Sequence, residues 1–253
     1  MSGSGDRPPI VVIPDGLAAL LNAVTAVAEA NTGRVALVGG LAVAARVPSG
    51  ANPHRATLDI DLVVEDTDPS VETVLASSGA TNEGTLYLAD TKVDIIVTLP
   101  VTDEDLDGLG DDQRLFLVGH RWALETADAM TLRRLGSASE VTLAVGTPAG
   151  LFAAKSGAAG FPRPGRRATK HGGDLYDLLR LAEVHNREGS LAHELVLAPG
   201  DIAPIIAGVI RREILANPAR ARAQMAAATD RPIDLDQVID VFEALVEDLE
   251  RPG

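Results

Sequence analysis

Two neighbouring stretches decide the fold: Val38-Gly-Gly-Leu-Ala-Val-Ala-Ala-Arg-Val47 and Arg55-Ala-Thr-Leu-Asp-Ile-Asp-Leu-Val-Val64. A glycine pair opens the first, and the apolar run behind it predicts a short helix, whereas the second predicts a strand. Side chains alternate along a strand, so Asp59 and Asp61 leave the same face of the sheet. Two like charges held this close need a counter-charge. A divalent cation such as Mg²⁺, bound by one or two carboxylates and by substrate phosphates, is the most economical one.

A second strand carries a third carboxylate. In the apolar run over residues 92–99, Val93, Ile95 and Val97 point one way, and Asp94 points the other way together with Ile96. A charge in such a strand is costly unless it is paired, hydrated or bound to a metal. Asp94 is therefore a paired charge, a hydrated charge, or a further ligand of the same cation, Mg²⁺ or Mn²⁺, beside the pair at residues 59 and 61.

The composition limits the function classes. The chain has 253 residues, of which 46% are hydrophobic and only 3% aromatic, so base stacking on an aromatic platform is disfavoured. A net charge of −14 repels nucleic acid and anionic membranes unless a local patch overrides it. The absence of cysteine excludes disulfides and thiolate metal sites, and agrees with a cytoplasmic protein. The sequence contains no apolar run long enough for a signal peptide or a membrane span, so we expect neither.

Hydrophobic periodicity and turn residues predict an α/β (α+β) chain with a mixed sheet followed by helices. The expected units are a disordered or expression-derived leader over residues 1–9, a sheet domain over 10–146 and a helical domain over 147–253. Expected strands cover residues 10–13, 35–38, 57–64, 84–88, 92–99 and 141–145. Expected helices cover residues 17–27, 41–47, 71–77, 148–158, 174–182, 191–197, 202–215, 218–228 and 235–249. The stretch over 103–112 holds six acidic side chains and two glycines, which predicts a solvated loop.

One segment reverses the acidic balance of the chain. Residues 155–170 contain no acid and five basic side chains, namely Lys155, Arg163, Arg166, Arg167 and Lys170. This segment either binds an RNA backbone through Arg166, Arg167 and Lys170 or forms an ordinary basic loop. The histidines show no metal-ligand spacing. Only His171, beside Lys170, is kept as a remote candidate for a functional residue.

A helix is expected after Gly172-Gly173, with Asp174 and Asp177 near its start. Acidic side chains in a first helical turn interact favourably with the helix dipole, and this would explain both residues without any function. The alternative is that Asp174 belongs to a functional site. Arg55 is equally open, since it either anchors a phosphate group or solvates a loop.

The combination of Gly39-Gly40, Asp59, Asp61 and Asp94 resembles the polymerase-beta-like nucleotidyltransferase superfamily. The resemblance implies that the sheet domain has the nucleotidyltransferase fold, that the helical domain contributes to the active site, and that metals held by the carboxylates support in-line displacement at the α-phosphorus. It also implies that the glycine pair, Arg55 and Thr57 contact the nucleotide. This chain has Gly-Gly where Gly-Ser is common in the superfamily.

A narrower resemblance rests on Arg-x-Thr-x-Asp-x-Asp at residues 55–61, on Lys155 and on Asp174-Leu-Tyr-Asp-Leu. These motifs are similar to those of the AbiEii-type and MenT-like nucleotidyltransferase toxins of toxin–antitoxin systems, over about residues 35–182. The resemblance implies that Lys155 contacts the nucleotide phosphates and that Asp174 orients this lysine or the acceptor. It also implies transfer to transfer RNA or to protein, and a cognate antitoxin as partner.

Three function hypotheses follow from these observations. The first is a metal-dependent nucleotidyltransferase that uses a nucleoside triphosphate to modify RNA or protein, and that acts as a toxin. The second applies the same chemistry to a small molecule, as in enzymes that adenylylate antibiotics, because a cationic drug would suit an acidic cleft. The third is a non-catalytic nucleotide-binding or antitoxin-type module, against which the intact carboxylate trio argues.

Overall fold

The computed structural model describes residues 8–13, 20–25, 34–47, 57, 59–65, 85–88, 91–98, 100, 102–134, 136, 140–161 and 168–251. Several expectations lie outside these residues: the helix at 71–77, Arg55, Arg163, Arg166, Arg167 and most of the leader at 1–9. The structure confirms the α/β class, with a mixed sheet followed by helices.

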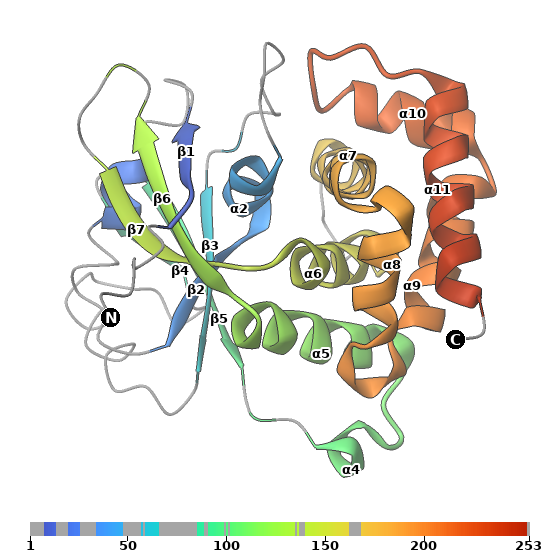
Figure 1. The fold of residues 1–253 in the computed structure, drawn as a ribbon, viewed down its shortest axis with the longest axis horizontal. Coiled ribbons are helices and arrows are strands. Elements are labelled where there is room, and N and C mark those ends of the chain that lie inside the picture. The colour runs from blue at the N-terminus through green and yellow to red at the C-terminus, as the bar shows by residue number, and fades with distance from the viewer. Residues whose placement is uncertain are drawn as a thin grey trace, which may run out of the picture.

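The described strands form one seven-stranded mixed sheet (Figure 1). Its order is β1-β6-β7-β2-β3-β5-β4. The pairs β1–β6, β7–β2 and β3–β5 are parallel, and the other neighbours are antiparallel. The strands are β1 (Ile10–Ile13), β2 (Val35–Val38), β3 (Asp59–Glu65), β4 (Thr85–Leu88), β5 (Thr91–Thr98), β6 (Asp128–Arg134) and β7 (Glu140–Val145).

Helices α5 to α11 lie to one side of the sheet, and α10 and α11 are farthest from it (Figure 1). Residues 20–25 are also helical. The α-helices are α2 (Gly39–Arg46), α4 (Asp103–Leu106), α5 (Asp111–Glu125), α6 (Pro148–Gly160), α7 (Ala168–His185), α8 (Ser190–Val196), α9 (Ala203–Ile210), α10 (Pro218–Ala226) and α11 (Leu235–Glu250). A π-helical turn, Arg211–Leu215, continues α9, and two 3₁₀ turns, Arg187–Gly189 and Pro199–Asp201, flank α8.

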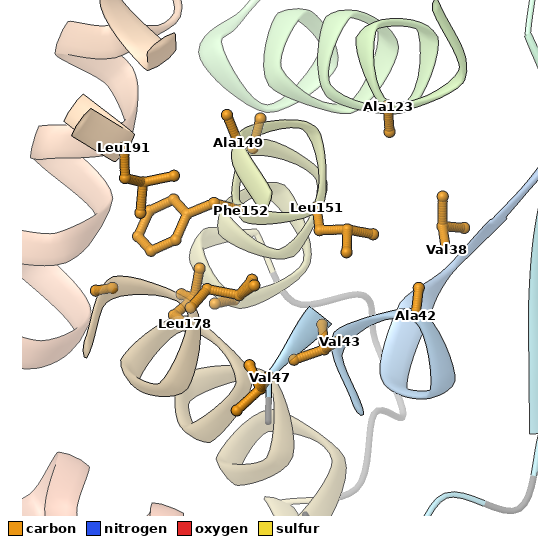
Figure 2. Packing of buried hydrophobic residues seen from close by; sticks show 14 of the residues in the cluster. Val38, Ala42, Val43, Val47, Ala123, Ala149, Leu151, Phe152, Leu178 and Leu191 are labelled. Atoms are coloured by element: carbon orange, nitrogen blue, oxygen red, sulfur yellow. The ribbon is translucent and has the colours of Figure 1, made fainter. Parts of the chain in front are cut away.

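Helix α6 is at the centre of the core, and nearly all its side chains are buried. Its start has clear local causes, because the Thr147 hydroxyl accepts a hydrogen bond from the Gly150 amide and Pro148 occupies the first turn. Phe152 and Leu151 pack among side chains of α2, α7 and α8 (Figure 2). This buried cluster runs without interruption across residue 147, and the division into two domains at that point stays a prediction.

Helices α5 and α6 approach closely because glycine faces alanine at two crossing points. A Cβ atom added to Gly150 would lie 2.7 Å from the Cα of Ala123, and one added to Gly119 would lie 3.0 Å from the backbone of Ala153. The small residues let α6 sit deep between α5 and α7. The side chain of Lys155, on α6, is therefore buried.

The structure departs from the expected local structure at three places. The acidic stretch 103–112 is a loop only over residues 107–110, because Thr102 and Asp105 form a capping box at the start of α4 and α5 begins at Asp111. Helix α7 begins at Ala168, so Gly172-Gly173 lies inside it rather than before it. Helix α5 and strand β6 were not expected at all.

Among the described residues, no single helix has the length and apolar character to cross a membrane. One bent pair, Arg187–Val196 with Pro199–Leu215, passes the same test of length and composition only when its two parts are taken together.

Candidate metal centre

The three predicted carboxylates converge. Strands β3 and β5 are parallel neighbours, and their register sets Asp61 directly opposite Asp94. Asp59 is two residues before Asp61 on β3 and therefore lies on the same face of the sheet. Oxygen atoms of the three carboxylates lie within 4.8 Å of one another, and all three residues are half-buried. The prediction that these residues share one face is confirmed.

The start of α2 closes one side of this cluster. Strand β2 pairs with β3 so that Val38 faces Asp61, and the next residue, Gly39, has a φ of +70°. A Cβ atom added to Gly39 would lie 1.9 Å from Oδ2 of Asp61 and 2.6 Å from its Cγ. Only glycine combines this left-handed backbone with the close approach, so the backbone of α2 and the carboxylate of Asp61 touch directly. The expected role of the glycine pair as a helix start is confirmed.

Two lysines and a threonine contact the carboxylates. Lys92 forms an ion pair with Asp94, and Nζ of Lys170 lies 3.9 Å from Oδ2 of Asp59. The hydroxyl of Thr57 donates a hydrogen bond of 3.2 Å to Oδ1 of Asp59. The predicted basic residue Lys170 therefore reaches the carboxylate cluster from the first turn of α7.

Burial is the main influence on the ionisation of Asp61, and the charges around it modify this effect. Burial raises the pKa of Asp61, and the neighbouring charges of Asp59 and Asp94 raise it further, while Lys155 and Lys170 oppose the shift. Burial opposes the charged form of Lys92, but the hydrogen bond to Asp94 and the charges of all three carboxylates outweigh it and raise the pKa of this lysine. The site thus attracts cations.

Behind the carboxylates, a buried lysine lies between two buried aspartates. Nζ of Lys155 is 2.9 Å from Oδ1 of Asp174 and 2.8 Å from Oδ2 of Asp177. Both aspartates lie on one face of α7, since residues three apart are neighbours on a helix. They are not in the first turn of α7, so the explanation of these residues by the helix dipole is wrong. The functional alternative named only Asp174, and the structure adds Asp177 as a second partner of Lys155.

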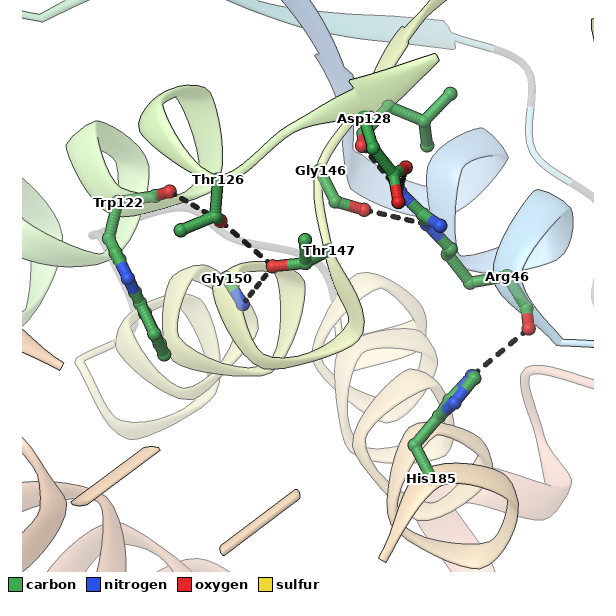
Figure 3. A network of polar contacts seen from close by, with 9 residues as sticks. Arg46, Trp122, Thr126, Asp128, Gly146, Thr147, Gly150 and His185 are labelled. Carbon is green, nitrogen blue, oxygen red and sulfur yellow. Dashed lines mark hydrogen bonds and ion pairs between the residues drawn. The ribbon is translucent and has the colours of Figure 1, made fainter. Parts of the chain in front are cut away.

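The far end of α2 is fixed by a polar network (Figure 3). Arg46 pairs with Asp128 and donates hydrogen bonds of 2.9 Å to the Gly146 carbonyl and 2.7 Å to the Val145 carbonyl. Nε2 of His185, at the end of α7, lies 3.0 Å from the carbonyl oxygen of Arg46. These contacts tie the end of α2 to β6, to the end of β7 and to α7.

Comparison with known proteins adds no assignment. No family model matches the chain, and no curated protein is detectably similar to it. The chemistry of the site is therefore argued from the residues themselves.

The donor set of the carboxylate cluster consists of carboxylate oxygens only, which suits hard cations such as Mg²⁺ and Mn²⁺. Burial and, to a smaller extent, the neighbouring carboxylates raise the pKa of Asp61, and a bound cation would favour its charged form. The residues fit such an ion.

The other predicted residues divide clearly. Gly40 is buried within α2, and Thr57 is buried against Asp59. His171 is half-buried on α7 and belongs to no group of potential metal ligands among the described residues. Sequence reasoning missed Lys92. Its signal was available, because a residue two positions before Asp94 shares its face of the strand.

Proposed function

We propose that the protein is a metal-dependent nucleotidyltransferase that transfers a nucleoside monophosphate from a nucleoside triphosphate to an acceptor hydroxyl. The observation that carries the proposal is the carboxylate cluster on two parallel strands, with the start of α2 packed directly against Asp61. Phosphates favour a helix start, where free backbone amides gather, and the cation favours the carboxylates beside it.

The proposed reaction uses these residues in defined roles. The acceptor oxygen attacks the α-phosphorus, the bond from this phosphorus to the bridging oxygen breaks, and pyrophosphate leaves. Asp94 takes the acceptor proton. Asp59, Asp61 and Asp94 would hold Mg²⁺ or Mn²⁺, which supplies charge stabilisation to the attacking and leaving oxygens when bound. Transfer requires that the nucleotide and the acceptor be aligned at one face of the sheet.

The lysine on α6 supports the site through its charge. Only 10% of the Lys155 side chain is exposed, and its ammonium group is held by two aspartates. Among the groups that favour the ionised form of Asp61, Lys155 has the largest effect on its pKa. We assign Lys155 to keeping this carboxylate charged, and Asp174 and Asp177 to positioning the lysine. A contact of Lys155 with the nucleotide phosphates stays a prediction of the resemblance.

Transfer RNA or a protein is the favoured acceptor, and a toxin paired with an antitoxin in the cytoplasm is the favoured biological setting. Both parts of the proposal come from the resemblance of the Asp-x-Asp and Asp-Leu-Tyr-Asp motifs. The ammonium group of Lys170 lies at the edge of the carboxylate cluster and would contact the phosphate backbone of a transfer RNA acceptor.

The test is transfer of radioactive label. The protein is incubated with each nucleoside triphosphate, labelled on the α- or on the γ-phosphate, with Mg²⁺ or Mn²⁺ and with total transfer RNA or a cell extract. We expect transfer of α-label only, lost in Asp59→Ala and Asp61→Ala and retained in Asp240→Ala, which removes an exposed carboxylate of α11. Transfer of γ-label, or no transfer to any acceptor, would contradict the proposal.

A further inference from the structure

The register of β3 and β5 arranges four side chains in a square. Asp61 stands opposite Asp94 on one rung of the ladder, and Asp59 stands opposite Lys92 on the next rung. Residues 59 and 61 share a face of β3, and residues 92 and 94 share a face of β5. Three corners of the square are therefore carboxylates, and Lys92 occupies the fourth.

Lys92 is placed to interact with the same oxygens that would bind a cation. Its ammonium forms an ion pair with Oδ2 of Asp94, and the side chain of Asp94 is 22% exposed. A divalent cation coordinated by the cluster needs a lone pair of Asp94, and it repels an ammonium group at the same carboxylate. The lysine must give up at least part of its contact when the cation arrives.

The side chain of Lys92 can move when this happens. It is 38% exposed, in contrast to Lys155, which is enclosed and held by two aspartates. A lysine carries a compact charge on a flexible four-carbon stem, so the ammonium group of Lys92 can leave Asp94 and stay beside the carboxylate cluster. Displaced there, the ammonium needs another anion.

We propose that Lys92 is a specificity-determining residue that exchanges Asp94 for a phosphate of the nucleotide when the metal-bound nucleotide enters. The exchange penalises the free cation, which must displace the lysine without offering it a partner. It favours the cation that arrives with a triphosphate, which supplies both the cation for Asp94 and an anion for Lys92. The phosphate contact rests on the proposed function, whereas the competition for Asp94 rests only on the carboxylate cluster.

Two binding measurements on the full chain test this exchange. The first is a titration with Mn²⁺ alone, followed by electron paramagnetic resonance. The second is a titration with each of the four nonhydrolysable α,β-methylene nucleoside triphosphates at saturating Mg²⁺. The variant is Lys92→Met, which keeps most of the length of the unbranched side chain and removes its charge. Its thermal unfolding is measured alongside, to show that it folds.

The proposal predicts effects of opposite sign. In Lys92→Met, Mn²⁺ alone should bind about tenfold more tightly, and the preferred nucleotide analogue about tenfold more weakly, within the usual range of coupling between sites. Lys92→Arg should restore both affinities toward those of the native chain because it keeps the charge. Lys170→Met, which removes a more exposed lysine 3.9 Å from Asp59, should change Mn²⁺ binding less.

The outcomes separate the two parts of the argument. Unchanged or weaker binding of Mn²⁺ in Lys92→Met would overturn the competition for Asp94, even if label transfer supports the proposed function. Tighter binding of Mn²⁺ with unchanged binding of every analogue would overturn the exchange with phosphate. If no analogue binds the native chain, both the exchange with phosphate and the proposed function are contradicted. The metal titration still decides whether Lys92 and the cation compete for Asp94.

Discussion

Replacing Gly39 by alanine should damage both the stability and the metal affinity of the protein. The left-handed backbone at this residue costs an L-residue about 1–2 kcal/mol. The new methyl group would also lie 1.9 Å from Oδ2 and 2.8 Å from Cβ of Asp61, and overpacking of this kind costs about 1–3 kcal/mol. The sum predicts a loss of about 2–5 kcal/mol in the free energy of unfolding.

A matched control separates the two contributions. Gly108 has a φ of +79°, but a Cβ atom added there would have no neighbour within 4 Å among the described residues. Gly108→Ala should therefore lose only the cost of the backbone. Both variants are unfolded with urea, and the free energies are compared by linear extrapolation. The excess loss in Gly39→Ala measures the contact with Asp61.

The double variant with Asp61→Gly removes all three of the clashing atoms. In that background, Gly39→Ala should cost no more than Gly108→Ala. In the native background, Gly39→Ala should also abolish or strongly weaken binding of Mn²⁺, because Asp61 has to turn away. Equal losses of stability in the two glycine variants, with unchanged Mn²⁺ affinity in Gly39→Ala, would refute the contact on which the site is built.

Four further predictions test the surroundings of the site. Asp61→Asn should raise the melting temperature at neutral pH, because burial and like charges make the ionised carboxylate costly; the gain should vanish below the ordinary pKa of 3.8, where the native carboxyl is protonated. Lys155→Met leaves two buried aspartates without their cation and should cost about 3–5 kcal/mol in urea unfolding. Burial lowers the pKa of His185, so its contribution to stability is present above pH 6.5 and lost as the pH falls through its lowered pKa; His185→Gln should flatten this part of the profile of melting temperature against pH. In urea unfolding, Gly172→Ala, whose methyl group meets a backbone carbonyl of α10 at 2.1 Å, should cost about 1–3 kcal/mol. The methyl group of Gly208→Ala meets no atom of the described residues within 4 Å, so this variant should stabilise helix α9 by about 1 kcal/mol.

Local patterns predicted the heart of the site well. The alternation around Asp59 and Asp61, and the lone charge at Asp94 in an apolar run, are properties of single strands. The sequence could therefore place each carboxylate on the correct face. Only the parallel pairing of β3 with β5, which is a long-range contact, brings Asp61 opposite Asp94.

The start of α7 shows where local reasoning fails. Glycine weakens a helix, so Gly172-Gly173 was interpreted as a turn before the helix. In the structure the residue at position 172 is small because α7 passes against the carbonyl group of Gln224 in α10. A tertiary contact thus overrides the local propensity, and no pattern within residues 168–185 reveals it.

The surroundings of Lys155 were hidden for the same reason. A lysine on an alanine-rich helix is usually exposed, and its two partners follow 19 and 22 positions later in the chain. Burial of α6 depends on the close approach of α5 at Gly119 and Gly150. The sequence indicated Lys155 only through a resemblance of motifs, and the contacts with Asp174 and Asp177 supply the physical reason for its position.

The central claim is that Asp59, Asp61 and Asp94 form a site for a divalent cation. The most direct measurement is a titration of the native chain with Mn²⁺ by electron paramagnetic resonance, repeated with Asp61→Asn and Asp94→Asn. The structure predicts saturable binding that is lost or strongly weakened in both variants, because each removes one of three carboxylates whose oxygens lie within 4.8 Å of one another. Binding that is absent from the native chain, or equally strong in the two variants, would contradict the account.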